Sequence, residues 1–591
     1  MVFLSVLLTG CGENPLIKGA DPDDTTVSGD EDYEGDDPGE CSDGADNDRD
    51  GDYDCDDSDC EGSPDCEDTQ EEPSSEPSSE PSSEPSSEVS SEPSSEPATE
   101  PSSEPSSESG VFECDSSATQ ELTTPNLSLI MGSAYQNSGG TLTGSLLGWD
   151  VEICDIDNDG YDDLITSSPY YASNLGRVRI FYGPGDLIQS STSASDFDVA
   201  IYALGPSVAS AVLLGTKVAC GDVDGDGDDD LIMSSGELSS ANMGLYVFNN
   251  NGLSQRLTQD THVMDADIIV NMDAGASTGS FWPQFWVADV DGDSKEEVLL
   301  FNNNNVNYSA ENPNNALTNG DNKIWALDLD GVSGSTQAAA VVGVKLNADE
   351  ADAITDIQTL DDADGDGIAD LFVGQGYLHD GSNIPGRLSY LTGYPSSNDT
   401  VGNIAEGELN GSGSDRFGQS VAVGDFDADG QSEFFVGAPG SNNGSGELFY
   451  FNRQPSSLNG SVDASVLDDF SFNGITSNAT LGLGWEVQSI GDVDGDGADD
   501  LLVSNYNRWS SPDGAVYVLS GSCLHQGYTL SNSTITEFSS NGATDFAVSS
   551  DFGDIDGDGL LDFAIGAFGY VDSVSLGNPE GAVYVYLSSQ Q

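Results

Sequence analysis

Basic side chains are scarce in this chain of 591 residues. Lysine and arginine together number 13, against 106 aspartates and glutamates, so the formal net charge is −93. A surface this acidic repels nucleic acids and anionic lipid headgroups, so neither is expected as a partner. The three histidines, His262, His379 and His525, stand beside no nucleophile motif, which disfavours an enzyme.

Long apolar runs are also lacking. No stretch approaches the roughly 18–20 apolar residues that a membrane-spanning helix needs. No segment shows a sustained helical period of apolar residues either. These absences favour an all-β chain that contacts a membrane, if at all, only through a lipid anchor.

What the chain has in abundance is a nine-residue acidic pattern, Asp-x-Asp-x-Asp-Gly-x-x-Asp/Glu. It recurs seven times, with neighbouring copies 62 to 73 residues apart, which is about the length of one propeller blade. A fixed period of this kind predicts a fold built from like units. The copies begin at Asp155, Asp222, Asp289, Asp362, Asp425, Asp492 and Asp554.

The spacing within each copy suits a calcium ion. In the sixth copy, side-chain oxygens come from Asp492, Asp494 and Asp496, a backbone carbonyl from Ala498, and a further carboxylate from Asp500. Calcium takes about six to eight oxygen ligands, and glycine at the sixth position permits the sharp turn that gathers them. We therefore predict about seven Ca²⁺ ions in the repeats.

Other interpretations of the pattern fit less well. An acidic turn that binds nothing is the alternative for a single match, but seven copies in register favour calcium. Magnesium needs tighter octahedral geometry, and an EF-hand is excluded because no copy carries a glutamate at position 12.

The same positions supply the predicted ligands in the other copies. These are Asp155, Asp157, Asp159, Tyr161, Asp163, Asp222, Asp224, Asp226, Asp228, Asp230, Asp289, Asp291, Asp293, Lys295, Glu297, Asp362, Asp364, Asp366, Ile368, Asp370, Asp425, Asp427, Asp429, Gln431, Glu433, Asp554, Asp556, Asp558, Leu560 and Asp562. The third copy has Ser294 in place of glycine and Lys295 beside the site, so we expect it to bind most weakly.

Strand-like segments surround each acidic loop. A β-rich stretch such as 421–423 precedes the loop, an apolar run such as 501–503 follows it, and a third strand such as 515–519 comes later. With a weaker fourth strand, each unit becomes one four-stranded antiparallel blade.

The ends of these strands carry a recognisable motif. The fifth unit reads Phe417-Gly418, then the acidic loop, then Val436-Gly437-Ala438-Pro439. This resembles the FG-GAP repeat of integrin α-subunit propellers and of many bacterial surface proteins. The first half is echoed by Leu147-Gly148, Leu214-Gly215 and Leu483-Gly484, whereas units three and four depart with Phe281-Trp282 and Ile354-Thr355. The resemblance covers residues 112–591 and implies a seven-bladed β-propeller.

The two ends of this region complement each other. Few residues follow the strand at 583–586, so the last unit lacks its fourth strand, while 127–131 forms a strand with no blade of its own. We predict that 127–131 completes blade seven and removes an exposed sheet edge.

The first 40 residues resemble an export signal followed by an acidic tail. Leu8-Thr9-Gly10-Cys11 resembles a bacterial lipobox, which implies a lipoprotein signal over 1–11 and lipidation of Cys11. The short, uncharged start leaves a plain export signal or a chance apolar start as alternatives. Residues 12–40 are expected to be acidic and disordered. The resemblance places the protein on a bacterial outer membrane or cell surface.

A cysteine-rich segment and a linker follow. Residues 41–66 contain Cys41, Cys55, Cys60 and Cys66, and they resemble Cys-flanked calcium modules of the thrombospondin type-3 kind. Their predicted ligands for an eighth ion are Asp46, Asp48, Asp50 and Asp54. Two disulfides are expected, with zinc as the alternative. Residues 67–111, rich in Pro-Ser-Ser-Glu, are expected to form an extended disordered tether.

Four cysteines lie in the propeller region. Cys154 and Cys220 precede acidic loops and are predicted to be buried thiols, while Cys114 and Cys523 flank the closure region and are a candidate pair.

We interpret the chain as a calcium-stabilised adhesion or ligand-binding module and not an enzyme. By resemblance to integrin propellers, an unknown protein or glycan partner binds the face opposite the calcium hairpins. Aromatic side chains that stack on sugars or anchor proteins gather in the loops of that face: Tyr170, Tyr171, Tyr308, Tyr377, Tyr506, Trp509, Phe568 and Tyr570. A polysaccharide-active enzyme on a propeller scaffold and a purely structural envelope protein are the alternatives.

Overall fold

The computed structural model describes the propeller region with gaps. The described residues are 126–132, 135–136, 142–184, 197–203, 212–236, 243–249, 257–272, 283–302, 323–347, 354–360, 368–376, 385–474, 482–506, 514–539, 545–570 and 580–588. The chain divides into two units, Met1–Glu104 and Pro105–Gln591, and the described residues all belong to the second. The predicted segments 1–11, 12–40, 41–66 and 67–111 lie outside them.

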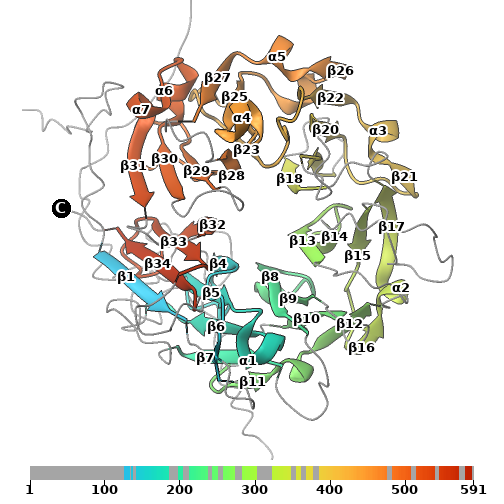
Figure 1. The fold of residues 1–591 in the computed structure, drawn as a ribbon. Coiled ribbons are helices and arrows are strands. Elements are labelled where there is room, and N and C mark those ends of the chain that lie inside the picture. Colours follow the sequence, from blue (N-terminus) through green and yellow to red (C-terminus); the bar gives the residue numbers. More distant parts are fainter. Residues whose placement is uncertain are drawn as a thin grey trace, which may run out of the picture. The chain divides into compact units, whose positions relative to one another are not determined.

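Seven sheets, numbered here by their acidic loops, form the blades of a ring (Figure 1). Blade 1 contains β4 (Val151–Cys154), β5 (Asp163–Ser167), β6 (Arg177–Phe181) and β7 (Val199–Tyr202), and blade 2 contains β8 (Leu214–Gly221), β9 (Asp230–Ser235), β10 (Met243–Phe248) and β12 (Ile268–Met272). Blade 3 contains β13 (Pro283–Ala288), β14 (Glu297–Asn302), β15 (Lys323–Leu327) and β17 (Val342–Asn347), and blade 4 contains β18 (Asp356–Leu360), β19 (Asp370–Gly374), β20 (Arg387–Leu391) and β22 (Gly407–Asn410).

The remaining blades follow the same order. Blade 5 contains β23 (Val421–Gly424), β24 (Glu433–Gly437), β25 (Glu447–Phe451) and β27 (Phe470–Asn473), and blade 6 contains β28 (Leu483–Ser489), β29 (Leu501–Asn505), β30 (Ala515–Leu519) and β31 (Thr534–Ser539). Blade 7 contains β32 (Phe546–Gly553), β33 (Asp562–Ala567), β34 (Ala582–Leu587) and β1 (Asn126–Met131). The all-β, seven-bladed prediction is confirmed.

The acidic loops connect the first two strands of each blade. The first strand of every blade lies nearest the centre of the ring (Figure 1). It pairs antiparallel with the second strand, as in the register Val151↔Thr166 and Cys154↔Asp163 of blade 1. Residues 148–150 and 168–170 therefore lie at the opposite end of the blade from the loop 155–163.

Blades 1 to 4 carry a fifth strand that the four-stranded prediction lacked. The added strands are β11 (Thr261–His262), β16 (Gly334–Gln337), β21 (Asp399–Thr400) and β26 (Gly460–Asp463). Each lies in the chain just before the fourth strand of the next blade and pairs parallel with the outer strand of the blade before it. This crossing segment covers a sheet edge that would otherwise be open to pairing.

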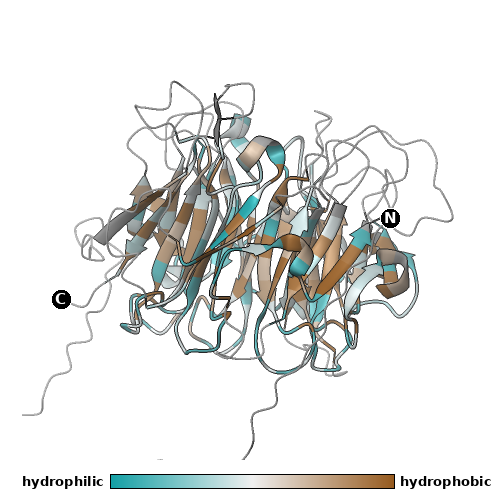
Figure 2. Cartoon of the chain, turned by 90° about the horizontal axis from the view of Figure 1, so that it is seen from below, coloured by the Kyte–Doolittle hydropathy of each residue, from teal (hydrophilic) through white to brown (hydrophobic). Residues whose placement is uncertain are grey.

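The apolar core is divided among the seams between blades. Seven clusters of buried side chains each combine residues from two neighbouring blades, such as Val247 and Val270 with Phe285 and Leu300 between blades 2 and 3. Central strands such as β24 are buried at every position, which explains why they read as continuous apolar runs. Figure 2 shows the apolar residues, in brown, concentrated in these strands.

The predicted closure of the ring is confirmed. β1 pairs antiparallel with β34, with the register Leu129↔Tyr584 and Ile130↔Val583. The first and last described strands therefore lie side by side (Figure 1).

The other elements are short. They are the hairpin strands β2 (Tyr135–Gln136) and β3 (Leu142–Thr143), the α-helices α1 (Tyr171–Asn174), α2 (Ala338–Val341), α3 (Val401–Ile404), α4 (Ser441–Gly444), α5 (Ala464–Leu467), α6 (Gly521–His525) and α7 (Leu530–Ser533), and the 3₁₀ turns η4 (Val263–Asp265) and η5 (Pro455–Ser457). Within the described part of the chain, no helix has the length and apolar character needed to cross a membrane.

Candidate metal centre

The acidic loops fold around their own first aspartate. In loop 6, Asp492 Oδ1 accepts the N–H groups of Gly495 at 2.7 Å and Asp496 at 3.1 Å, and Oδ2 accepts that of Gly497 at 2.9 Å. Gly495 and Gly497 have φ values of 80° and 93°, which residues with a Cβ rarely adopt. The sequence therefore builds a tight loop with its carboxylates turned to one point.

Three carboxylates come together in each of five loops. Within each group the candidate ligand oxygens lie within 4.8 Å of one another. The groups are Asp155/Asp157/Asp163, Asp222/Asp224/Asp230, Asp289/Asp291/Glu297, Asp425/Asp427/Glu433 and Asp492/Asp494/Asp500. The first, third and ninth positions are thus brought together as a calcium site requires.

The fifth-position aspartate is placed differently in these five loops. It is not among the three grouped residues. Asp496 Oδ1 instead accepts the N–H of Ala498 at 3.0 Å, and Asp159 Oδ1 accepts that of Tyr161 at 3.1 Å. The predicted backbone ligands at the seventh position, such as Ala498, stay predictions.

The fourth and seventh loops complete the set. Asp362, Asp364 and Asp366 lie outside the described residues, whereas Asp370 is buried and accepts a hydrogen bond from the Tyr390 hydroxyl at 2.7 Å. In loop 7, Asp554 accepts the N–H groups of Gly557, Asp558 and Gly559 at 2.8 to 3.0 Å, as Asp492 does in loop 6.

The third loop keeps its shape without glycine. Ser294 takes φ 71°, in the left-handed region, and donates its N–H to Asp289 Oδ2 at 2.9 Å. Lys295 Nζ pairs with Asp330 Oδ1 at 2.6 Å, and so lies against a carboxylate outside its own loop. The left-handed conformation costs energy for a residue with a Cβ, and weaker binding at this loop stays a prediction.

The loop carboxylates are buried and crowded together, and both conditions favour binding of a cation. Burial, followed by neighbouring aspartates, raises the pKa of Glu433 to about 8, and burial raises that of Asp500 to about 8. Asp224 Oδ1 and Asp494 Oδ2 are buried carboxylate oxygens with no hydrogen-bond partner. Buried polar atoms need partners, and hard oxygens at this spacing are what calcium takes. The residues therefore fit Ca²⁺ as a resident ion.

Neighbouring loops are joined by a carboxylate that the sequence reasoning missed. At three seams, the eighth-position residue of one loop accepts the N–H of the first aspartate in the preceding blade's loop. Glu296 Oε2 accepts from Asp222 at 2.9 Å, Asp499 Oδ2 from Asp425 at 2.9 Å, and Asp162 Oδ2 from Asp554 at 2.7 Å. The backbone completes each link with a bond in the reverse direction, such as Asp499 N–H to the Asp425 carbonyl at 2.9 Å.

A glycine makes room for each of these carboxylates. A Cβ added at Gly221 would lie 2.3 Å from Glu296 Oε2, at Gly424 2.6 Å from Asp499 Oδ2, and at Gly553 2.5 Å from Asp162 Oδ2. The sequence signal is thus a glycine directly before the first aspartate combined with an acidic eighth residue in the next unit.

The seam between blades 1 and 2 carries a disulfide. Cys154 directly precedes Asp155, Cys220 lies two residues before Asp222, and the two cysteines are bonded to one another. The prediction of buried thiols was wrong for both, because adjacent inner strands bring the two side chains together, a pairing that neither strand reveals alone. Cys523 is also disulfide-bonded, and its partner lies outside the described residues, so pairing with Cys114 stays a prediction.

Aromatic side chains gather at the blade ends opposite the loops. Trp149, which the sequence reasoning missed, lies between Tyr170 at 5.8 Å and Phe568 at 5.0 Å between ring centroids. Tyr171 stacks under the guanidinium of Arg177 at 3.9 Å. Tyr170, Tyr171, Phe568 and Tyr570 are half-buried. The signal for Trp149 is its place directly after Leu147-Gly148.

The other predicted ligand-face residues fare differently. Tyr506 is 2 % exposed, packs against Trp485 and donates its hydroxyl to Asp545 at 3.2 Å, so the expectation of an accessible ring is corrected. Tyr308, Tyr377 and Trp509 lie outside the described residues, as do Cys11, Asp46, Asp48, Asp50 and Asp54.

The profile of the FG-GAP repeat matches residues 147–181 and 417–451. The chain carries FG-GAP repeats. The FG-GAP positions are where blades meet: Leu147, Leu214, Phe417 and Leu483 each form a parallel bridge to a glycine of the preceding blade, Gly581, Gly176, Gly386 and Gly446 respectively.

Three relatives align with part of the chain. Phosphatidylinositol-glycan-specific phospholipase D of Rattus norvegicus is 35 % identical over 157 residues, or 24 % of this chain and 17 % of the phospholipase. The Mus musculus counterpart is 32 % identical over 164 residues, or 25 % and 18 %. Integrin alpha-PS2 of Drosophila melanogaster is 29 % identical over 183 residues, or 29 % and 11 %. The match thus spans less than a fifth of each relative.

The alignment with a solved structure, BBS1N in complex with ARL6DN, covers 78 % of this chain and 97 % of the solved chain, at 8 % sequence identity and a TM-score of 0.38. A TM-score this low does not establish a relationship between the two proteins. The FG-GAP propeller fold suggests a ligand-binding or adhesion-type module, and it is typical mainly of non-enzymatic proteins.

Proposed function

We propose that this protein is a calcium-stabilised adhesion or ligand-binding propeller tethered to a bacterial surface. The observation that carries the proposal is the gathering of three carboxylate oxygens within 4.8 Å in each of five loops. Without a cation these carboxylates repel one another. A bound ion stabilises the folded ring by mass action, because it binds the folded state and not the unfolded chain.

The partner is proposed to bind at the seam of blades 7 and 1, on the face opposite the loops. Trp149, Tyr170 and Phe568 form a half-buried aromatic cluster there. Such rings present apolar area with little conformational entropy to lose, which suits stacking on a sugar or anchoring a protein. Several half-buried rings at one place distinguish this seam from the buried Tyr506.

The two histidines that the structure describes are engaged in local hydrogen-bond contacts, which supports a module without catalysis. His262 Nδ1 accepts the N–H of Met264 at 3.0 Å, and His525 Nδ1 lies 3.1 Å from the Tyr450 hydroxyl. The phospholipase activity in the names of two relatives is not part of the proposal, because the match spans 17–18 % of those proteins.

The experiment compares binding of the full-length protein to arrayed glycans and to bacterial and host cells, with calcium and with excess chelator. We expect binding that needs calcium and is lost in Trp149→Ala/Phe568→Ala. The matched control is Trp485→Ala, which removes the corresponding tryptophan of blade 6, packed on the buried Tyr506. Equal binding by all three proteins would overturn the proposed ligand face.

Surface attachment is proposed through Cys11 and the tether of residues 67–111. Growth with a clickable fatty acid should label the wild-type protein and leave Cys11→Ser unlabelled and released from the membrane fraction. An unlabelled wild-type protein in the periplasm would contradict lipid anchoring.

A further inference from the structure

A pocket of about 320 Å³ opens where the crossing segment of blade 2 passes blade 1. Residues 257–267 come between β10 and β12 in the chain and pair with β7 through β11. This volume lies near the lower end of the roughly 300–1,000 Å³ that ligand pockets occupy. The pocket lies on the loop side of the ring, because its lining includes Ile156 of loop 1, so it is separate from the aromatic cluster proposed above.

The inner wall of the pocket is apolar and firmly packed. Ile180, Tyr182, Leu231 and Phe248 are each less than 8 % exposed and belong to the core of the blade 1–2 seam. The Tyr182 hydroxyl donates to the carbonyl of Leu257 at 3.3 Å, which holds the crossing segment over the wall. The pocket therefore has a rigid apolar wall, and an apolar group of a ligand can be buried against this wall.

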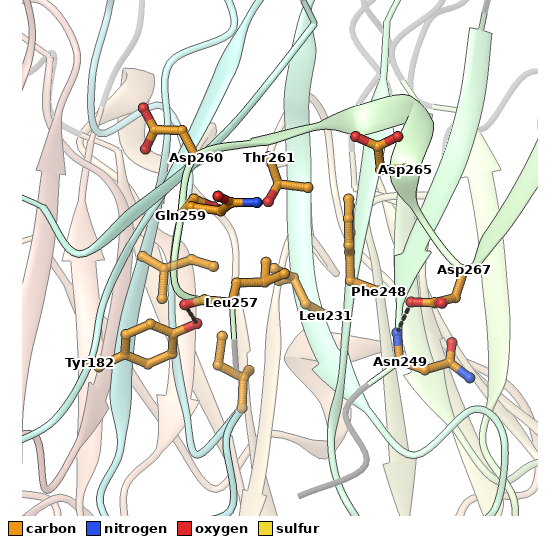
Figure 3. Close-up of a pocket in the computed structure, with 12 residues that line it drawn as sticks. Tyr182, Leu231, Phe248, Asn249, Leu257, Gln259, Asp260, Thr261, Asp265 and Asp267 are labelled. Atoms are coloured by element: carbon orange, nitrogen blue, oxygen red, sulfur yellow. Dashed lines mark hydrogen bonds between the residues drawn. The ribbon is translucent and has the colours of Figure 1, made fainter. Parts of the chain in front are cut away.

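The rim of the pocket is acidic. Asp260, Asp265 and Asp267 surround the opening, with Gln259 and Thr261 between them (Figure 3), and none of the twelve lining residues is basic. Asp260 Oδ1 already accepts the N–H of Ala200 at 3.1 Å, and Asp267 Oδ2 accepts that of Asn249 at 3.2 Å. Asp265 and the second oxygen of Asp267 are therefore the carboxylate groups that a ligand would meet.

Blade 5 contains the same local structure with a guanidinium already in place. Asp267 accepts the N–H of Asn249 at 3.2 Å and donates its own N–H to the Val247 carbonyl at 2.9 Å. Asp469 of blade 5 accepts the N–H of Asn452 at 2.9 Å and donates to the Tyr450 carbonyl at 2.9 Å.

The guanidinium of blade 5 comes from Arg453. Its Nη2 donates to the Leu467 carbonyl at 2.9 Å and lies 3.5 Å from Asp469 Oδ2. In blade 2 the residue corresponding to Arg453 is Asn250, and the residue corresponding to Leu467 is Asp265. At these two corresponding positions, blade 2 thus has an asparagine and a further carboxylate in place of the arginine and the leucine.

We propose that this pocket binds an organic cation, a guanidinium or ammonium group on a short apolar stem. The charged group lies between Asp265 and Asp267, as Arg453 lies beside Asp469 in blade 5, and the stem lies on Phe248 and Leu231. A guanidinium is weakly hydrated and matches carboxylates well, while the apolar wall distinguishes the ligand from a bare metal ion. The source is either a free amine or guanidine, or a basic side chain of a partner protein.

The test is calorimetric titration of the full-length protein in saturating calcium at physiological salt. The probes are n-butylguanidinium, n-butylammonium and the neutral n-butylurea. We expect saturable binding of the two cations at one site per chain and at least ten-fold weaker binding of the urea. Absence of saturable cation binding up to about 10 mM, or equal binding of n-butylurea, would overturn the proposal.

Substitutions locate the site. Asp265→Asn/Asp267→Asn should weaken n-butylguanidinium binding at least ten-fold, because the charges are lost while an asparagine oxygen can still accept the Asn249 N–H. Asp469→Asn is the matched control, since it makes the same change in blade 5. The melting temperatures of the two variants should agree, which separates loss of binding from loss of folding. Binding that survives the double substitution, or that Asp469→Asn reduces equally, contradicts the site.

A second pair of probes identifies the source of the cation. If acetyl-Gly-Arg-Gly-amide binds at least ten-fold more tightly than n-butylguanidinium, and acetyl-Gly-norleucine-Gly-amide does not bind, the source is a protein side chain. Equal affinity of the arginine peptide and n-butylguanidinium assigns a free organic cation. Binding of the norleucine peptide as tightly as the arginine peptide would overturn the requirement for charge.

Discussion

Asp499 of blade 6 is bonded in both directions to Asp425 of blade 5. Its Oδ2 accepts the Asp425 N–H at 2.9 Å, and its own N–H donates to the Asp425 carbonyl at 2.9 Å. Asp425 is also the first residue of loop 5 and belongs to its carboxylate group. The arrangement of one loop is thus held by the next blade.

Removing this link should loosen loop 5. We expect Asp499→Ala to lower the stability of the calcium-loaded protein by about 1–3 kcal/mol, the cost of leaving a half-buried N–H without its charged partner. Thermal denaturation and calcium titration measure the effect. Ser432→Ala, at the eighth position of loop 5, is the control, because Ser432 carries no carboxylate. Equal melting temperatures for both variants and the wild type would contradict the link.

Closure by β1 should be essential to the whole ring. Ile130 is fully buried between blades 7 and 1, so Ile130→Ala should cost about 2–5 kcal/mol, and deletion of 112–140 should destabilise the entire propeller. Val466→Ala changes a side chain that is 70 % exposed and should leave the denaturant midpoint unchanged. A deletion variant that melts like the wild type would mean that the ring does not depend on β1.

A buried glutamate on an inner strand, away from the acidic loops, should make the folding stability depend on pH. Burial raises the pKa of Glu486 on β28 to about 7. A carboxyl whose folded-state pKa lies above its unfolded value contributes stability that is complete below about pH 4.5 and is lost as the pH rises through about 7. Ser550 donates its hydroxyl to Glu486 Oε2 at 2.6 Å, a bond that glutamine can also accept.

Glu486→Gln should therefore raise the melting temperature by about 1–2 °C at pH 8 and leave it unchanged near pH 4.5. Glu537→Gln, an exposed position on β31, is the control and should have no pH-dependent effect. A stabilisation of Glu486→Gln that is equal at both pH values, or a destabilisation at pH 8, would contradict the assignment.

The disulfide between Cys154 and Cys220 should stabilise the seam of blades 1 and 2. It closes a separation of 66 residues, and loss of a native bridge of this kind typically costs about 2–4 kcal/mol. Cys154→Ser/Cys220→Ser should melt lower than the wild type without reductant and equally with it. Peptide mapping without reduction provides the direct check, and free thiols at both positions in the purified protein would refute the bridge.

Local patterns allowed much of this structure to be predicted. The first, third and ninth residues of each loop lie close in the chain, so spacing alone predicted that their carboxylates come together, as they do in five loops. The apolar runs of β9 and β24 reflect burial on both faces. The partnerless strand at 127–131 identified the closure. These signals survive in a single sequence because they depend on short stretches of chain.

Features that depend on neighbouring blades could not be predicted in the same way. β11 and β21 are only two residues long and pair because the outer strand of another blade lies beside them. The Cys154–Cys220 bond, the burial of Tyr506 and the link from Asp499 to Asp425 likewise arise from contacts across seams.

Calcium removal tests the central claim most directly. At about 10 mM Ca²⁺ and dissociation constants of about 0.1–1 mM, each loop should stabilise the folded state by about 1.4–2.7 kcal/mol. Metal analysis of the full-length protein at dialysis equilibrium with about 10 mM Ca²⁺, corrected for the calcium of the outer buffer, should give about seven bound ions in the repeats. Calorimetric melting before and after chelation should show a melting temperature that falls steeply when the ions are removed. A protein that binds no calcium above the buffer level and melts at the same temperature with and without chelator would contradict the account.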